Sequence, residues 1–316
     1  MLANWHRHFI KQLFHYDRRR LDIEGAFALK HHHLPKTLYK FRSFTKSHLD
    51  ALQRGVLYRS PPDAFNDPFD TAAFIKSDLV NRAITPEEIK RLMTASTGSI
   101  AAGNFGELAK GNLIEDILRS YSDSKPLGVS ASFTQTQRIL TEINVAREED
   151  AIERLSSDLR SGTSVLSLSE ALTSILMWSH YAKDHSGFAI AYKINTLPKL
   201  HPFCRTCFPV IYTDKPRNMS RYVFGENLNN LWLTFASMMK FSDWSYEKEW
   251  RVVLPLGPNS AHGEITTPAI AHIYLGANAS VQDIELMRQF CADSQIPLSI
   301  MKLERASGLL KATPLQ

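Results

Sequence analysis

The sequence predicts an α+β protein with a mixed, largely antiparallel central sheet that carries a helical insertion. Three observations support this fold class. Apolar and polar residues alternate at 38–43 and at 244–254, which is typical of half-buried strands. Helical periodicity dominates residues 78–160, and a β-α-β pattern occupies residues 270–303.

Composition limits the classes of protein that need consideration. The chain has 316 residues, of which 44% are hydrophobic and 22% charged, so it can bury a sizeable core. Its formal charge of +5 permits an anionic ligand or nucleic acid, but much of the excess lies early, as at Arg18–Arg20. Three cysteines fit a reducing compartment. Because neither a signal peptide nor a membrane-length apolar run is evident, we expect a cytoplasmic protein without a membrane partner.

Three regions follow from the patterning. Residues 1–37 are expected to form a basic helical extension, because Phe9, Leu13 and Phe14 recur at near-helical spacing. Residues 38–304 are expected to form a single α+β domain, with 78–160 as a mostly helical insertion. Residues 305–316 are expected to be a tail.

The first half of the domain has clear local signals. Residues 38–43 and 56–59 are predicted strands, and Gly55 ends a helix predicted over 46–54. A turn-rich loop follows at 60–70. It carries three oxygen-bearing side chains, Asn66, Asp67 and Asp70. These side chains either contact a ligand such as a ribose or cation, or simply cap turns.

The second half begins with a strand predicted at 164–170, which runs into a helix through Tyr181. Ser167 and Glu170 have the spacing of a capping box at the start of that helix. Further strands are expected at 188–192 and 210–212, and an amphipathic helix at 228–241. His201, Cys204 and Cys207 have metal-like spacing but lack a second half, so no metal site is predicted.

The stretch 244–254 is the most informative one. As a strand with period two, it places Glu247, Glu249 and Arg251 on one face and aromatic residues such as Trp250 on the other. Two carboxylates and a guanidinium on one face form either a functional site or a lattice of ion pairs.

Four segments in this order resemble a bacterial family, the domain of unknown function 2971: Leu-Tyr-Lys-Phe-Arg-Ser at 38–43, Phe-Asn-Asp-Pro-Phe-Asp at 65–70, Met-Trp-Ser-His-Tyr-Ala at 177–182, and Tyr-Glu-Lys-Glu-Trp-Arg at 246–251. The resemblance spans residues 38–276. It supports a domain assignment and implies no settled activity.

A second, distant resemblance suggests a chemistry. Arg42, then Ser167 with Ser169, then Glu247 with Glu249 follow the Arg, Ser-x-Ser, Glu-x-Glu order of ADP-ribosyltransferases. The resemblance implies a split central sheet like that of ADP-ribosyltransferases. It also implies an NAD-dependent transferase that modifies an unknown macromolecular acceptor, either protein or nucleic acid.

Under this hypothesis Glu249 stabilises the cation that develops on the nicotinamide ribose, and Glu247 orients or deprotonates the acceptor. Arg42 holds a phosphate or ribose, and the two serines brace the strand that carries the glutamates. The expected cofactor-binding residues also include His180, Tyr181 and Tyr39. A further group is expected either to contact the substrate or to stabilise the loop: Asn66, Asp67, Asp70, Trp178 and Arg251.

Two alternatives remain open. Asp67, Asp70, Glu247 and Glu249 could bind magnesium in a nucleic-acid-directed effector, as a nuclease or a binding module. The chain could also be a non-catalytic interaction protein whose charged strand is a salt-bridged surface. An effector in bacterial defence against phage, or a toxin, fits either activity. The sequence carries no signal of oligomeric state.

Overall fold

The computed structural model describes residues 4–67, 69–71, 163–215, 218, 219, 222, 229, 231–255 and 263–315. These residues all fall within one compact unit of the chain. The insertion predicted at 78–160 lies outside them.

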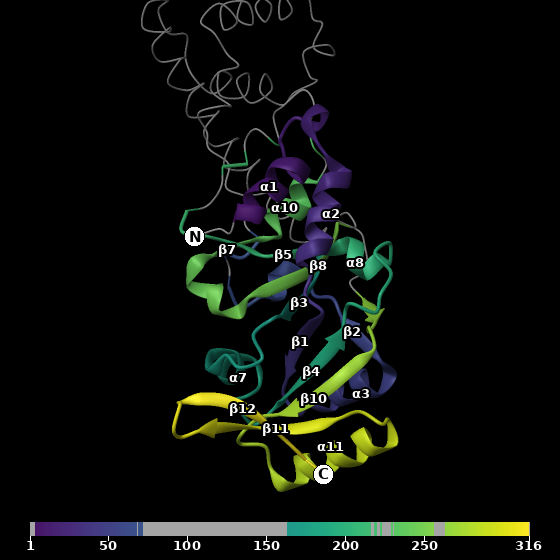
Figure 1. Ribbon diagram of the computed structural model, residues 1–316, viewed down its shortest axis with the longest axis vertical. Coiled ribbons are helices and arrows are strands. Elements are labelled where there is room, and N and C mark those ends of the chain that lie inside the picture. The colour runs from purple at the N-terminus through teal and green to yellow at the C-terminus, as the bar shows by residue number, and fades with distance from the viewer. Residues whose placement is uncertain are drawn as a thin grey trace, which may run out of the picture. The chain divides into compact units, whose positions relative to one another are not determined.

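An eight-stranded sheet organises this unit, in the order β12-β11-β10-β4-β1-β3-β8-β5 (Figure 1). Its strands are β1 (Thr37–Arg42), β3 (Thr163–Ser169), β4 (Phe188–Lys193), β5 (Cys207–Pro209), β8 (Glu249–Pro255), β10 (Ile270–Leu275), β11 (Leu298–Glu304) and β12 (Leu309–Pro314). Neighbouring strands are antiparallel except β10 and β11, which helix α11 (Val281–Asp293) connects in parallel. The predicted α+β class with a mixed, largely antiparallel sheet is therefore confirmed.

Smaller elements surround the sheet. Two short ladders pair β2 (Val56–Tyr58) with β9 (Glu264–Thr266), and β6 (Ile211–Thr213) with β7 (Met239–Phe241). The other described helices are α1 (Asn4–Leu13), α2 (Ile23–His33), α3 (Lys46–Arg54), α7 (Ile175–Tyr181), α8 (Pro202–Thr206) and α10 (Trp232–Ala236). Short 3-10 helices occur at η1 (Arg18–Arg20), η2 (Pro62–Ala64) and η6 (Ser242–Glu247).

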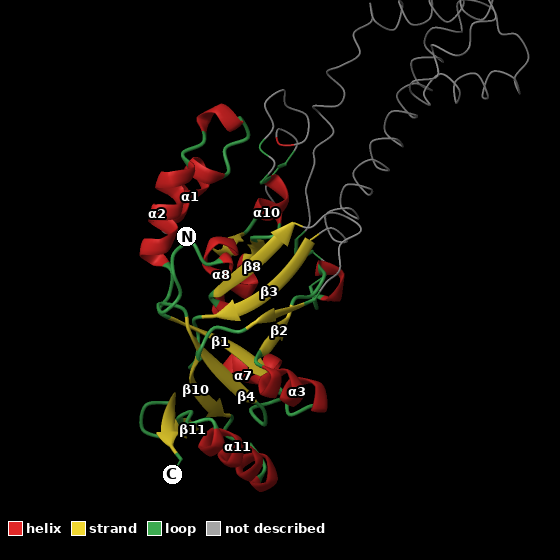
Figure 2. Cartoon of the chain, turned by 90° about the vertical axis from the view of Figure 1, so that its right-hand side faces the viewer, coloured by secondary structure: helices red, strands yellow, loops and turns green. Residues whose placement is uncertain are grey.

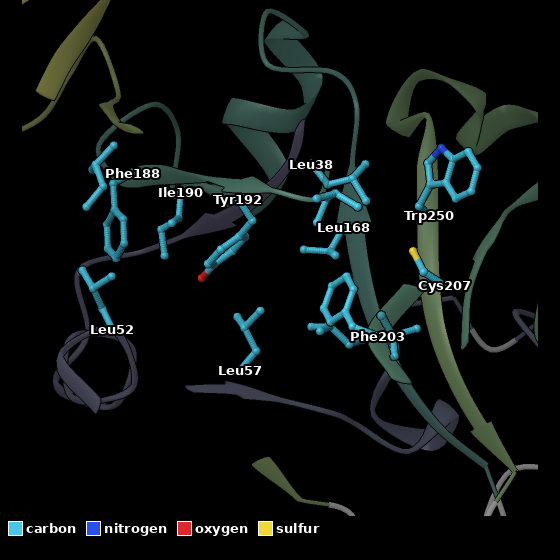
Figure 3. Close-up of a cluster of buried hydrophobic side chains, with 14 of the residues drawn as sticks. Leu38, Leu52, Leu57, Leu168, Phe188, Ile190, Tyr192, Phe203, Cys207 and Trp250 are labelled. Carbon is cyan, nitrogen blue, oxygen red and sulfur yellow. The ribbon is translucent and has the colours of Figure 1, made fainter. Parts of the chain in front are cut away.

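The main core lies on one face of the sheet, where α3 and β2 cover β4. Thr45 caps the start of α3, and Gly55 ends it in the left-handed conformation, with φ of 63°. This fixed turn directs Leu52 and Leu57 toward the side chains of β4, such as Ile190, as Figure 3 shows. A smaller cluster around the fully buried Trp178 of α7 covers the opposite face. The sheet is thus packed on both faces around β1 and β4.

The sheet divides between β1 and β3. Tyr39 and Ser169 are the only residues through which these strands pair, whereas β1 pairs with β4 along its whole length. Beyond that pair, Ser60 exchanges two backbone hydrogen bonds with Val165 of β3 in place of β1. We call this divergence of Lys40–Arg42 from Val165–Ser167 the fork. Figure 2 shows β3 and β8 turning away from β1, β4 and β10.

The structure adds detail at the two ends of the chain and corrects one prediction there. The N-terminal region contains two helices, and Trp5 of α1 stacks on Trp250 of β8 with ring centroids 6.3 Å apart. The triplet His31–His33 forms the last turn of α2. The region 305–316, which was expected to be a tail, contains β12, an edge strand paired along the length of β11.

Three further predictions were wrong for local reasons. Ser167 lies inside β3, and the residue that caps α7 is Ser174, whose hydroxyl accepts a hydrogen bond from the Met177 N–H. The long helix expected over 228–241 is replaced, where the structure describes it, by the short α10 and then by β7. The strand expected from 244 begins only at Glu249, after η6.

Candidate functional site

A cavity of about 710 Å³ opens at the fork. Its wall includes β1, β3, α3, α7, β7, β8 and the loop after β2. Eleven of the predicted site residues line this cavity: Tyr39, Arg42, Asn66, Asp70, Ser167, Ser169, His180, Tyr181, Glu247, Glu249 and Arg251. This volume lies within the range of small-molecule and cofactor sites.

Five charged side chains gather at one end of the cavity, which we call the charged end: Asp70, Lys240, Glu247, Glu249 and Arg251. Arg251 lies at its centre. Its side chain is only 1% exposed and forms a two-pronged ion pair with Asp70, at 2.7 and 2.6 Å. The same guanidinium donates to both oxygens of Glu249, at 2.8 and 3.0 Å, and to the Ser237 carbonyl at 2.7 Å. Because these groups are buried, their hydrogen bonds compensate for the loss of hydration. Arg251 therefore fixes two carboxylates that come from distant parts of the chain.

Lys240 of β7 joins the carboxylates into one network. Its ammonium lies 2.6 Å from Glu247, 3.3 Å from Glu249 and 3.5 Å from Asp70. It also lies over the Trp244 ring, 4.9 Å from the centroid. The charged end thus holds three carboxylates against two cations.

The two glutamates differ in their affinity for a proton. Burial raises the pKa of Glu249, but Arg251 and Lys240 outweigh it, so that pKa lies far below its usual range. Burial and the neighbouring Glu249 raise the pKa of Glu247, and Lys240 offsets only part of this increase. Two carboxyl groups whose pKa values move apart are typical of a site in which one stays charged and the other exchanges protons.

Glu247 also contacts Tyr181 of α7, which lines the same cavity. The Tyr181 hydroxyl donates to Glu247 at 2.5 Å, and burial followed by the charge of Glu247 raises the pKa of Tyr181. Asn66 in turn hydrogen-bonds Tyr181. The exposed His180 contacts the Tyr246 hydroxyl at 2.9 Å, at the edge of this group.

A turn of the backbone at Lys248 positions Glu247. Lys248 adopts a left-handed conformation with φ of 43°, which ends η6 and turns the chain into β8. The Ser169 hydroxyl donates to the Glu247 carbonyl at 2.5 Å and accepts from the Ala171 N–H at 2.9 Å. Glu247 and Glu249 therefore converge through a turn, and not through strand alternation as the sequence suggested.

Two basic side chains occupy the fork itself. The Lys40 Nζ atom donates to the Ser167 carbonyl at 2.6 Å, and so spans the gap where β1 and β3 no longer pair. Arg42 lies on the same face of β1, and burial lowers its pKa. Among the described residues, neither forms an ion pair with a carboxylate.

Two nominated residues lie outside the cavity wall. Trp178 is fully buried, and its indole N–H donates to the Leu172 carbonyl at 2.7 Å. Asp67 caps a turn through the Phe69 N–H at 2.9 Å. Sequence reasoning missed Lys240 as a site residue, because it lies in a stretch that was interpreted as an amphipathic helix.

The metal-like spacing of His201, Cys204 and Cys207 has a structural explanation. His201 caps α8 through the Phe203 N–H, and the Lys30 ammonium donates to the Cys204 carbonyl at 2.6 Å. Burial raises the pKa of Cys207 to about 12, which keeps its thiol protonated. Across the residues that the structure describes, no group of three or more His, Cys, Asp or Glu side chains has an arrangement that could hold a metal ion.

Comparisons with known proteins bear on only part of the chain. No curated protein and no solved structure matches it. Among the described helices, none has the length and apolar character needed to span a membrane. A family model does match residues 177–252, a segment that contributes Tyr181, Lys240, Glu247, Glu249 and Arg251 to the cavity. That model is the family described as protein of unknown function (DUF2971), so the family resemblance seen in the sequence motifs is confirmed over residues 177–252.

Proposed function

We propose that the cavity binds an NAD-like dinucleotide and transfers its ADP-ribose group to a macromolecular acceptor. The observation that carries this proposal is that Arg42, Ser169 and Glu247 line the same cavity, although they lie far apart in the sequence. Their types and chain order are those of the ADP-ribosyltransferase pattern. A surface lattice of ion pairs would not require a cavity at their meeting point.

The proposed reaction is a substitution at C1′ of the nicotinamide ribose. The bond from C1′ to the nicotinamide nitrogen breaks, and nicotinamide leaves as a neutral molecule with the bonding electron pair. A nucleophilic atom of the acceptor bonds to C1′ and gives up its proton. Because the transition state resembles an oxocarbenium ion, nearby carboxylates lower its energy.

Glu247 is the group best suited to receive the proton in this reaction. Its raised pKa places it nearer to the working pH, and Tyr181 holds one of its oxygens. Both oxygens of Glu249 are already engaged by Arg251, with Lys240 on one of them. In our proposal Glu249 therefore supplies fixed negative charge and orients its neighbours, and does not itself exchange protons.

Glu247→Gln is the decisive test. The variant keeps the size of the side chain but removes its charge, so nicotinamide release from labelled NAD should fall about a hundredfold or more. Glu285→Gln, in an exposed ion pair on α11, is a matched control that should keep full activity. Equal nicotinamide release and label transfer by the wild type and Glu247→Gln, with protein and nucleic-acid acceptors, would exclude the proposal.

The arrangement does not favour the metal-dependent alternative. Asp70 and Glu249 direct their oxygens at Arg251, and Asp67 lies away from the cavity wall. A divalent ion there would have to displace a buried guanidinium, which is unfavourable.

A further inference from the structure

We propose that Lys40 is a reactive amine, which condenses with the carbonyl carbon of an aldehyde or ketone that also carries an anionic group. This proposal does not rest on the nicotinamide chemistry above, although it concerns the same cavity and uses Arg42 and Glu247 again. It rests on the position of Lys40 in the cavity and on the neighbours that surround its nitrogen.

The two lysines of the cavity have different surroundings. Lys240 lies within 3.5 Å of three carboxylates, which hold it as a charged ammonium. Among the described residues, Lys40 has the Ser167 carbonyl as its hydrogen-bond partner and no carboxylate at ion-pair distance. A carbonyl accepts a hydrogen bond from a neutral amine as well as from an ammonium, so this contact orients the nitrogen in either state.

The charges around Lys40 favour the neutral amine. Burial lowers its pKa well below the usual value, and Arg42 on the same strand lowers it further. Glu249 of β8 and Glu247 of η6 act in the opposite direction without cancelling this effect. His48 of α3 is a further titratable neighbour, and burial lowers its pKa, which favours its uncharged form. A lysine that is buried beside another cation is a recognised way to make its nitrogen nucleophilic.

Arg42 determines the class of carbonyl compound. It follows Lys40 by two positions on the same face of β1, so their Cα atoms are about 7 Å apart. A guanidinium that lines a cavity without a carboxylate partner among the described residues suits a phosphate or carboxylate group of a ligand. The ligand is therefore an aldehyde or ketone with an anionic group a few bonds from its carbonyl carbon.

The step balances without an oxidant or a reductant. The nitrogen lone pair attacks the carbonyl carbon, and the carbonyl oxygen takes up a proton to give a carbinolamine. Loss of water then leaves the imine, and both hydrogens of the neutral amine leave with that oxygen. Glu247, which lines the same cavity and has a raised pKa, can protonate the departing hydroxyl group.

The test uses pyridoxal 5′-phosphate as the probe, because it combines an aldehyde with a phosphate. The full-length protein is incubated with the probe at pH 7 and reduced with borohydride, and each lysine is quantified by peptide mass spectrometry. Each unit by which a pKa is lowered increases the neutral fraction of a lysine about tenfold at this pH. We therefore expect Lys40 to be labelled at least about tenfold faster than the exposed Lys193 and Lys302.

Comparison probes separate the reactive amine from the anion-binding group. Pyridoxal without the phosphate should label Lys40 with weaker saturation, and formaldehyde with cyanoborohydride should still label it ahead of Lys193. Lys40→Arg should lose one equivalent of pyridoxal phosphate, and circular dichroism shows whether that variant is folded. The proposal is overturned if Lys40 of the wild type reacts no faster than Lys193 and Lys302 with pyridoxal phosphate and with formaldehyde. This outcome does not depend on the behaviour of the variant.

Discussion

Arg251→Met should destabilise the protein strongly, because it removes the cation on which the charged end of the cavity depends. Arg251 makes five hydrogen bonds with Asp70, Glu249 and the Ser237 carbonyl, and its side chain is 1% exposed. Breaking a buried ion pair by removing one partner costs about 3–5 kcal/mol. Lys240 stays near both carboxylates, so we expect a loss near the lower end, about 3 kcal/mol.

The loss of stability caused by Arg251→Met should become smaller as the pH is lowered. The pKa of Glu249 is lowered on folding, so its ion pair contributes stability above its ordinary pKa near 4.5. That contribution disappears as the pH falls through the lower pKa of the folded state. Arg251→Met removes the contribution, so the difference in the free energy of unfolding between wild type and variant should be largest near pH 7. It should shrink as the pH is lowered below about 4.5.

Urea unfolding followed by tryptophan fluorescence measures these differences. Arg288→Met is the control, because Arg288 forms an exposed ion pair with Glu285 and should change the free energy of unfolding by less than about 1 kcal/mol. The double variant Arg251→Met with Glu249→Gln should lose less stability than the sum of the two single changes. A loss for Arg251→Met no larger than that of the control would refute the idea that this buried network holds the cavity together.

Three further changes test other parts of the structure. Ser169→Ala removes the hydroxyl that contacts the Glu247 carbonyl, and should cost about 1–2 kcal/mol in urea unfolding and reduce nicotinamide release. Gly187→Ala would place a Cβ 2.2 Å from the Arg42 carbonyl, and should cost about 1–3 kcal/mol, measured by thermal unfolding. Burial lowers the pKa of Lys30 to about 8, so the folded state binds fewer protons than the unfolded state from about pH 8 to 10. Lys30 should therefore make stability rise over that interval, and Lys30→Met should flatten the rise; an unchanged slope would contradict this assignment.

Local signals predicted the elements that depend on neighbours in the sequence. Gly55 ends α3 where the sequence predicted it, and the alternation at 38–43 corresponds to β1. The alternation at 244–247 was misleading, because aromatic and polar residues in turn also fit a 3-10 helix. The left-handed Lys248 that separates this helix from β8 has no residue type that would reveal it.

The site depended on contacts that no local pattern contains. The sequence nominated Glu247, Glu249 and Arg251 as one group, and the structure does bring them together. Lys240, which connects the carboxylates, lies in a strand whose partner β6 is far away in the sequence. The role that we propose for Lys40, as a reactive amine, depends on the divergence of β1 and β3. That divergence is a property of the whole sheet.

The fork has a mechanical consequence. At the fork, Tyr39 and Ser169 are the only residues through which β1 and β3 pair, and the Lys40 side chain adds one hydrogen bond to the Ser167 carbonyl. Such a weakly paired boundary can open before the strands on either side of it lose their own hydrogen bonds. A small molecule that contacts the strands on both sides of the fork would stabilise the folded state. The melting temperature of the protein would then rise with the concentration of that molecule. Thermal-shift screening is therefore a direct way to find ligands of this protein, because it needs no assay of a reaction.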